Sequence, residues 1–185
     1  MKKIQFDDCI CHSKIKNHFK IKDDILSEID KCDDDNLNAV DSYYTDSISK
    51  LDWNKSSDTE RPWVKIFLPE FCEDVKEIVS SMCYNRINIK QMWYQQYLEG
   101  DTHGWHIHGQ HYTGVYYLEF PDGCSKTEVC SPYNFKTKQI DAVEGDLIVH
   151  NGVSKQSVAT DIVLPNASPA TALKVNNTDC ASLIC

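Results

Sequence analysis

Four of the seven histidines in this chain fall within nine residues, at positions 103, 106, 108 and 111. Imidazole nitrogen is a common ligand of Fe(II), Zn(II) and related metals. Residues two apart in an extended segment point to the same side, so His106 and His108 can both reach one ion. His103 and His111 stand at odd offsets, and we expect them to point elsewhere or to lie in turns. A third ligand must come from a distant strand, and the spacing alone leaves a solvated histidine-rich loop as the alternative.

Strand-like segments surround these histidines. Apolar and polar residues alternate before the pair and lead into a Gly-Asp turn, while an aromatic and β-branched run follows it. Turn residues separate the segments that we predict as strands, which are 87–100, 113–121, 128–135 and 138–150.

Helices are predicted ahead of the strands. The spacing of Ile21, Ile25 and Ile29 predicts a helix beginning near Lys22. The apolar run that starts at Trp63 is strand-like, and an amphipathic helix is predicted to begin at Pro69 and continue to Met82. Helices followed by short strands indicate an α+β, mainly β fold, with a sandwich or barrel as its second part.

The segment MWYQQYLEGDTHGWHIHGQHYTGVYYLEF, together with the later VEGDLIV, resembles the 2-oxoglutarate- and Fe(II)-dependent oxygenase superfamily. It is most similar to the small oxygenases of marine phages and bacteria, and the resemblance covers roughly residues 50–149. It implies a double-stranded β-helix, which is a cupin-like jelly roll, with N-terminal flanking helices. We therefore expect a helical and irregular flank at 1–62, a jelly-roll core at 63–160, and an atypical, poorly ordered tail at 161–185.

The resemblance also implies a metal site. His106 takes the first-histidine position of the family's facial triad, and His108 takes the position that is usually Asp or Glu. A neutral imidazole at 108 removes one negative charge from the site. The distal histidine of the family falls at about Gln156, so His150 is the candidate third ligand, reached through a shifted strand.

Cosubstrate residues are implied in the same way. Tyr97 and Tyr117 match tyrosines that lie near 2-oxoglutarate in related hydroxylases, although both also suit packing on strands. No arginine follows Arg86, so the carboxylate partner would be Lys155 or Lys174, and we favour Lys174. The implied cofactor is Fe(II), with 2-oxoglutarate as cosubstrate and ascorbate as an assisting reductant.

The last 36 residues, 150–185, contain no aromatic residue, no Arg and no Glu, and the family pattern stops after Val149. Three explanations stay open at this point. His150 completes the metal site, the enzyme is degenerate with two ligands, or a frameshift or misjoined gene end has replaced the family's usual ending.

Composition limits the classes of function. The formal net charge is −9, which argues against nucleic acid as the main partner. The nine cysteines form no CxxC pair, and neither a signal peptide nor a membrane-spanning run is evident, so we expect free thiols in a reducing, cytoplasmic compartment.

The predicted activity is hydroxylation of a small-molecule or peptidyl substrate coupled to decarboxylation of 2-oxoglutarate. Two alternatives stay open: a non-catalytic jelly-roll binding or accessory protein, as in a virion, and a cupin-type metalloenzyme that uses no 2-oxoglutarate. The sequence favours no particular substrate or oligomeric state.

Overall fold

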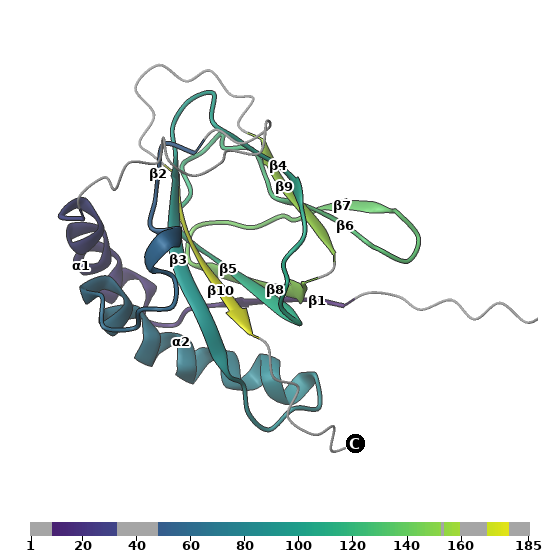
Figure 1. The fold of residues 1–185 in the computed structure, drawn as a ribbon, viewed down its shortest axis with the longest axis horizontal. Coiled ribbons are helices and arrows are strands. Elements are labelled where there is room, and N and C mark those ends of the chain that lie inside the picture. Colours follow the sequence, from purple (N-terminus) through teal and green to yellow (C-terminus); the bar gives the residue numbers. More distant parts are fainter. Residues whose placement is uncertain (1–8, 33–47, 153, 160–169, 178–185) are drawn as a thin grey trace, which may run out of the picture.

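The computed structural model describes residues 9–32, 48–152, 154–159 and 170–177 (Figure 1). Its elements in chain order are β1 (Ile10–Lys14), α1 (His18–Asp30), β2 (Lys50–Leu51), the 3-10 helix η2 (Trp53–Lys55), α2 (Pro62–Ser81), β3 (Ile89–Tyr97), β4 (Thr102–His106), β5 (Tyr112–Glu119), β6 (Glu128–Cys130), β7 (Thr137–Gln139), β8 (Asp146–Asn151), β9 (Lys155–Ala159) and β10 (Ala170–Asn177).

The strands form two antiparallel sheets. The larger sheet has the order β1-β8-β5-β10-β3-β2, and the smaller has the order β4-β9-β6-β7. Figure 1 shows α1 and α2 on one side of the larger sheet and the smaller sheet on the other. This arrangement confirms the predicted α+β, mainly β, jelly-roll architecture with flanking helices.

Strand alternation decides which side chains enter the space between the sheets. On β8, Leu147 and Val149 belong to the core cluster that packs against the helices, whereas Ile148 belongs to the cluster between the sheets. His150 has the same parity as Ile148 and is 1% exposed. Its ring therefore lies inside the roll.

Residues 170–177 correct our expectation for the tail. β10 lies between β5 and β3 in the middle of the larger sheet, and its central residue Leu173 is fully buried. The strand needs no aromatic residues of its own because Tyr94 and Tyr116 on its neighbours fill the same core. The structure therefore has a core strand at 170–177, inside the segment for which we expected an atypical, poorly ordered tail. Residues 161–169 and 178–185 lie outside the described ranges, and the three-part division stays a prediction.

Helix α2 corrects a second expectation. The apolar run at Trp63 is helical rather than strand-like, and one helix continues through Pro69 to Ser81. Trp63, Phe67 and Phe71 are buried at helical spacing. Pro69 has no N–H to donate to the preceding turn, but it does not end this helix because the buried face continues on both sides of it. Helix α1 is confirmed, although it begins at His18 rather than near Lys22.

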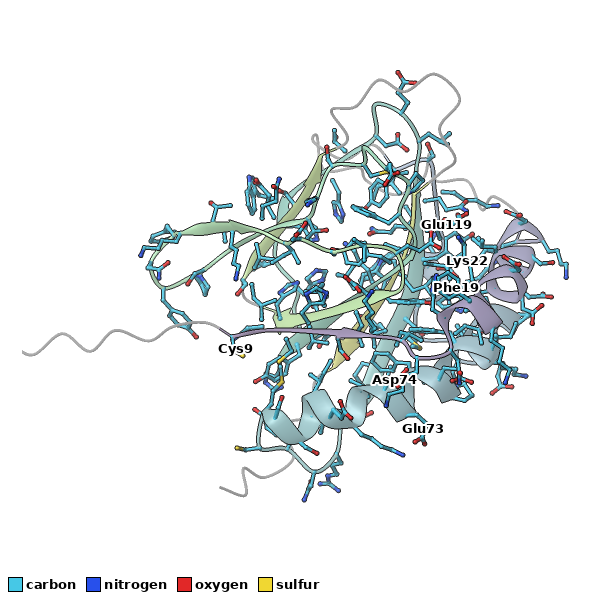
Figure 2. All side chains as sticks on the ribbon, turned by 180° about the vertical axis from the view of Figure 1, so that it is seen from behind. Cys9, Phe19, Lys22, Glu73, Asp74 and Glu119 are labelled. Carbon is cyan, nitrogen blue, oxygen red and sulfur yellow. The ribbon has the colours of Figure 1, made fainter. Side chains whose placement is uncertain are left out.

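A buried polar network joins α1 to the larger sheet. His18 lies 2.6 Å from the Tyr116 hydroxyl through Nδ1 and 3.1 Å from Glu144 through Nε2. Burial raises the pKa of Tyr116, so its hydroxyl keeps its proton and donates to Nδ1, leaving Nε2–H to donate to the carboxylate. Lys22 also donates to Glu144 at 2.8 Å. Figure 2 shows Lys22 close to Glu119 where the helix meets the sheet, so the flank belongs to the same core.

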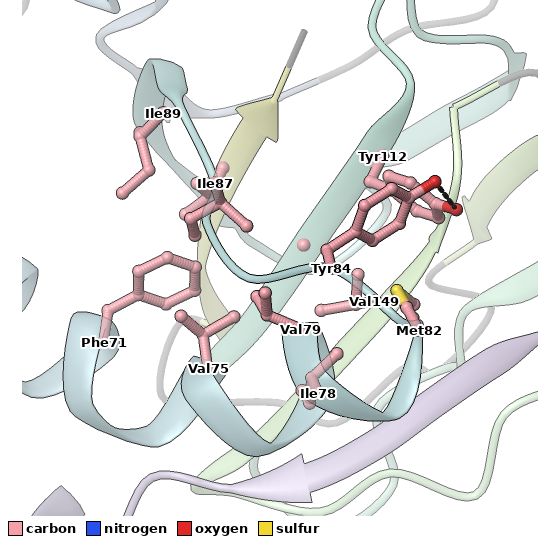
Figure 3. Close-up of a pocket in the computed structure, with 12 residues that line it drawn as sticks. Phe71, Val75, Ile78, Val79, Met82, Tyr84, Ile87, Ile89, Tyr112 and Val149 are labelled. Atoms are coloured by element: carbon pink, nitrogen blue, oxygen red, sulfur yellow. Dashed lines mark hydrogen bonds between the residues drawn. The ribbon is translucent and has the colours of Figure 1, made fainter. Parts of the chain in front are cut away.

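An apolar cavity of about 40 Å³ lies between α2 and the larger sheet (Figure 3). The hydroxyls of Tyr84 and Tyr112 meet at one end of it, 3.3 Å apart. Gly114 on β5 is one of the residues that line the cavity. A Cβ added at this glycine would lie 3.7 Å from Leu147 and Val175, which is an ordinary van der Waals distance. There is thus room for a methyl group at this glycine.

We expect Gly114→Ala to stabilise the protein. Alanine fills part of the cavity and reduces the freedom of the unfolded chain, which together should raise the free energy of unfolding by about 0.5–1 kcal/mol. Urea denaturation followed by circular dichroism measures the change. Gly145→Ala is the matched control and should destabilise, because Gly145 has φ +87° and its Cβ would lie 3.2 Å from the His18 ring. A loss of stability in Gly114→Ala would contradict the cavity.

Candidate functional site

A tight turn positions β4 after β3. Gly100 has φ +84°, a left-handed conformation that glycine adopts without strain. The buried Asp101 carboxylate accepts hydrogen bonds from the backbone N–H groups of Leu98 at 2.8 Å and Ser49 at 2.9 Å. The turn therefore sets where β4 begins, at Thr102, one residue before His103.

A β-bulge in β4 controls where its histidines point. His103 pairs with Val158 and His106 pairs with Gln156, so three steps along β4 oppose two steps along β9. The extra residue reverses the side-chain alternation between the two histidines. His103 is buried beside His106, with the two rings stacked 3.7 Å apart and 11° from parallel. Our expectation that His103 points elsewhere is wrong for this reason, whereas His111 is exposed as expected.

After the bulge, the side chains of residues 106–108 alternate between the inside and the outside of the roll, as we predicted. His106 and His108 turn inward, while the intervening Ile107 is 61% exposed. Their rings lie 4.9 Å apart and nearly perpendicular, at 80°. Two in-plane nitrogens can converge on one point in such an arrangement. Trp93 on β3 is buried at 2% exposure, whereas Trp105, next to His106, is 48% exposed.

The hydrogen bonding of His106 leaves one of its ring nitrogens available to bind a metal. A carbonyl can only accept, so Nδ1–H donates to the Gly104 oxygen at 2.7 Å and the lone pair lies on Nε2. That Nε2 is buried and has no hydrogen-bond partner among the residues that the structure describes. A buried nitrogen lone pair of this kind normally has a partner. Burial, reinforced by the charge of Lys174, lowers the pKa of His106 to about 3 and keeps the ring in its neutral, metal-binding form.

His150 approaches from the other sheet. Its Nδ1–H donates to the Asn151 carbonyl at 2.9 Å, and its ring lies 6.3 Å from that of His108. Gly152 makes this approach possible, because a Cβ there would lie 1.8 Å from the carbonyl oxygen of Gln110. The backbone N–H of His108 donates to the Gly152 oxygen at 2.8 Å and fastens the two segments together.

Gln156 lies opposite His106 on β9, which is where the family pattern placed the distal histidine. His150 lies on β8, where it is paired with Ile10 and Thr113. Its role as third ligand, and the shifted strand that we expected to bring it there, both stay predictions. The side chain of Gln156 lies outside the described part of the structure.

The histidines fit a metal in part. His106 and His108 suit two neighbouring coordination positions by ring geometry, and the tautomer of His106 leaves its Nε2 lone pair available. Within the described residues, however, no three His, Cys, Asp or Glu side chains stand close enough together to hold one ion. In this part of the chain two imidazoles thus lie side by side, and the metal site with its third ligand stays a prediction.

The three predicted cosubstrate residues line a single cavity. Tyr97, Tyr117 and Lys174 come from β3, β5 and β10 and border a space of about 20 Å³ between the sheets. Tyr97 donates to Gln95 Oε1 at 2.9 Å, and Tyr117 donates to Thr127 Oγ1 at 2.7 Å. The space accommodates roughly a water molecule, so a five-carbon diacid requires side chains to move.

Lys174 connects this cavity to the histidines. It is 1% exposed, and its Nζ lies 3.4 Å from His103 Nδ1. Burial, with a contribution from the Lys174 charge, strongly lowers the pKa of His103, so that ring is also neutral. The interior therefore places an ammonium beside uncharged imidazoles, a setting in which a carboxylate would be stabilised.

The buried histidines should make stability depend on pH. An unfolded histidine has a pKa near 6.5, whereas folded His106 stays neutral to about pH 3, so below pH 6.5 the unfolded state binds more protons. We expect the free energy of unfolding of the metal-free protein to fall as the pH drops from 7 to 5. His106→Gln should reduce this slope by up to about 1.4 kcal/mol per pH unit. Denaturant titrations at pH 7, 6 and 5 measure it, and equal slopes would contradict the neutral buried ring.

Metal binding should depend on His106. We expect Mn(II) or Fe(II) to bind the wild-type protein, and His106→Ala to weaken binding by at least about 100-fold, because half of the imidazole pair is lost. His111→Ala is the matched control, since this neighbouring histidine is exposed, and it should bind as wild type does. Isothermal titration calorimetry with Mn(II) separates the variants. Equal binding by wild type and His106→Ala would show that the site is misassigned.

Known structures share this arrangement of sheets and helices, whereas the sequence matches no family model and no curated protein. A prolyl-4-hydroxylase from Pseudomonas putida superposes with a TM-score of 0.65 at 12% identity, over 93% of each chain. A viral collagen prolyl hydroxylase from Paramecium Bursaria Chlorella virus-1, solved with 2-oxoglutarate, gives 0.61 at 10% identity, over 92% of this chain and 96% of that one.

A third structure belongs to an oxidoreductase of the 2OG-Fe(II) oxygenase family from Burkholderia pseudomallei. It gives a TM-score of 0.53 at 14% identity, and the match covers 63% of this chain but only 56% of that protein. At such identities the likeness concerns the fold, and the phage and bacterial branch stays a prediction. The chain has the double-stranded β-helix fold of the 2-oxoglutarate- and Fe(II)-dependent oxygenases, as the sequence resemblance predicted.

Proposed function

We propose that this protein is an Fe(II)- and 2-oxoglutarate-dependent dioxygenase that hydroxylates its substrate. The proposal rests on the buried Nε2 of His106, which lies beside His108 and has no hydrogen-bond partner within the described ranges. The likeness to prolyl hydroxylases supports it at the level of the fold.

Iron would be held by His106 and His108, with His150 as the third ligand. The bound metal would supply the dioxygen chemistry, in which 2-oxoglutarate is decarboxylated to succinate and CO₂ while a substrate C–H bond is hydroxylated. The protein's part is to hold the ligands in place. The Gly104 carbonyl fixes the tautomer of His106, and the Asn151 carbonyl does the same for His150.

The cosubstrate would lie in the cavity bordered by Tyr97, Tyr117 and Lys174. An ammonium has three donors, so Lys174 can hold His103 and a carboxylate at once. Burial keeps water away from this ion pair and strengthens it, which compensates for the missing bidentate fork of arginine. Burial also raises the pKa of Tyr117 to about 12, so its hydroxyl stays protonated and can turn its one proton from Thr127 to a carboxylate oxygen.

The substrate is proposed to be a small molecule or a peptidyl residue. The net charge of −9 disfavours nucleic acid, and two of the similar structures are prolyl hydroxylases. We propose a cytoplasmic location because the cysteine pattern, which lacks a CxxC pair, suits a reducing compartment. Within those ranges, no helix is long and apolar enough to cross a membrane.

A second candidate is a jelly-roll binding protein that keeps the fold without turnover. The incomplete ligand set within the described residues favours it. Such a protein would bind 2-oxoglutarate or a related acid through Lys174 and release no succinate.

The decisive assay measures succinate released from 2-oxoglutarate in air, with Fe(II) and ascorbate. We expect turnover by wild type, and for Lys174→Met a rise of at least about tenfold in the KM for 2-oxoglutarate, since a buried charge-assisted contact is lost. Lys138→Met is the matched control at an exposed lysine of β7 and should leave KM unchanged. Binding of 2-oxoglutarate without succinate would favour the binding protein, and turnover independent of 2-oxoglutarate would favour the cupin-type enzyme.

A further inference from the structure

His103 touches both halves of the candidate site. Its face lies on the His106 ring at 3.7 Å, and its Nδ1 lies 3.4 Å from Lys174 Nζ and 3.3 Å from the Tyr97 hydroxyl. The β4 bulge brings it there. One ring thus contacts a candidate metal ligand with its face and two residues that line the cosubstrate cavity, Tyr97 and Lys174, with its edge.

The geometry excludes His103 as a further metal ligand. Lone pairs of imidazole nitrogens lie in the ring plane, and the planes of His103 and His106 run parallel, 11° apart. Their nitrogens therefore cannot converge on one ion, unlike those of His106 and His108 at 80°.

The polar edge of His103 has a defined role. As an ammonium, Lys174 can only donate, and this assigns Nδ1 of His103 as its acceptor and Nε2 as the site of the ring proton. Tyr97, which donates to Gln95, lies against the same nitrogen. Lys174 and His103 come from different sheets, so this contact fixes the ammonium relative to the histidines.

We propose that His103 is a positioning residue, with two separable actions. Its Nδ1 holds the Lys174 ammonium at the cosubstrate cavity, and its face sets the plane of the His106 ring. The inference rests on the proposed function for its consequences in binding, although the contacts exist without any ligand.

Two substitutions separate the two actions. His103→Phe keeps a ring that can stack on His106 but removes the acceptor. His103→Asn keeps an acceptor close to the Nδ1 position but removes the ring. Purified variants are compared with wild type for the KM and kcat with 2-oxoglutarate, and for the Kd of Mn(II).

We expect each variant to weaken the binding of a different ligand. His103→Phe should raise the KM for 2-oxoglutarate by about tenfold and leave the Kd of Mn(II) within about twofold, because only the Lys174 contact is lost. His103→Asn should weaken Mn(II) binding by severalfold and change KM little. Equal losses of both ligands in both variants would show a merely structural role, and an absence of effect in both would also overturn the proposal.

A measurement on the metal-free protein keeps this inference distinct from the proposed function. Nitrogen-15 NMR of the imidazoles should show His103 as the Nε2–H tautomer, with an Nδ1 signal that shifts in Lys174→Met. If wild type binds neither Mn(II) nor 2-oxoglutarate, the function fails while this signal still tests the contact. An Nδ1–H tautomer, or a signal that Lys174→Met leaves unchanged, would overturn the positioning role.

Discussion

One extra residue in β4 controls the interior of this roll. The bulge between His103 and His106 reverses the alternation, so both rings lie inside, and His108 follows two residues later. A regular strand would place His103 on the outer surface. The stack on His106, the contact with Lys174 and the neutral state of both rings all depend on this local irregularity.

The bulge is supported from both ends. The Gly100 turn, closed by the Asp101 carboxylate, fixes the start of β4, while the close approach of Gly152 to the Gln110 carbonyl fixes the loop that carries His108. His150 is then held opposite by β8, whose outer side chains pack against the helices. The helices themselves contribute no side chain to the histidine cluster among the contacts described, so they act on the site by holding the larger sheet.

Much of this could be predicted from the sequence because regular spacing encodes it. Alternation correctly placed His106 and His108 on one side, and the resemblance identified Tyr97, Tyr117 and Lys174, which line one cavity. The position of His103 could not be predicted, since a bulge changes parity without a strong sequence signal. Gly104, which has no side chain, was the only hint of irregularity.

Two further predictions from the sequence were wrong because packing with distant residues outweighed a local signal. Pro69 suggested a helix start, but the buried face that runs from Trp63 carries one helix across it. The composition of the tail argued against a core strand, yet β10 occupies the centre of the larger sheet because neighbouring strands supply the bulky side chains. The pairing of His106 with Gln156 is a long-range property that only the folded sheets reveal.

The central claim is that His106 Nε2 is a buried base that faces a metal inside the roll. A crystal structure of the protein with Mn(II) and 2-oxoglutarate, recorded with anomalous scattering, tests it most directly. We expect an anomalous peak within about 2.0–2.3 Å of His106 Nε2, from a metal that is also bonded to His108, with the cosubstrate extending toward Lys174. A peak elsewhere, or a protein group hydrogen-bonded to that nitrogen in place of metal, would contradict it.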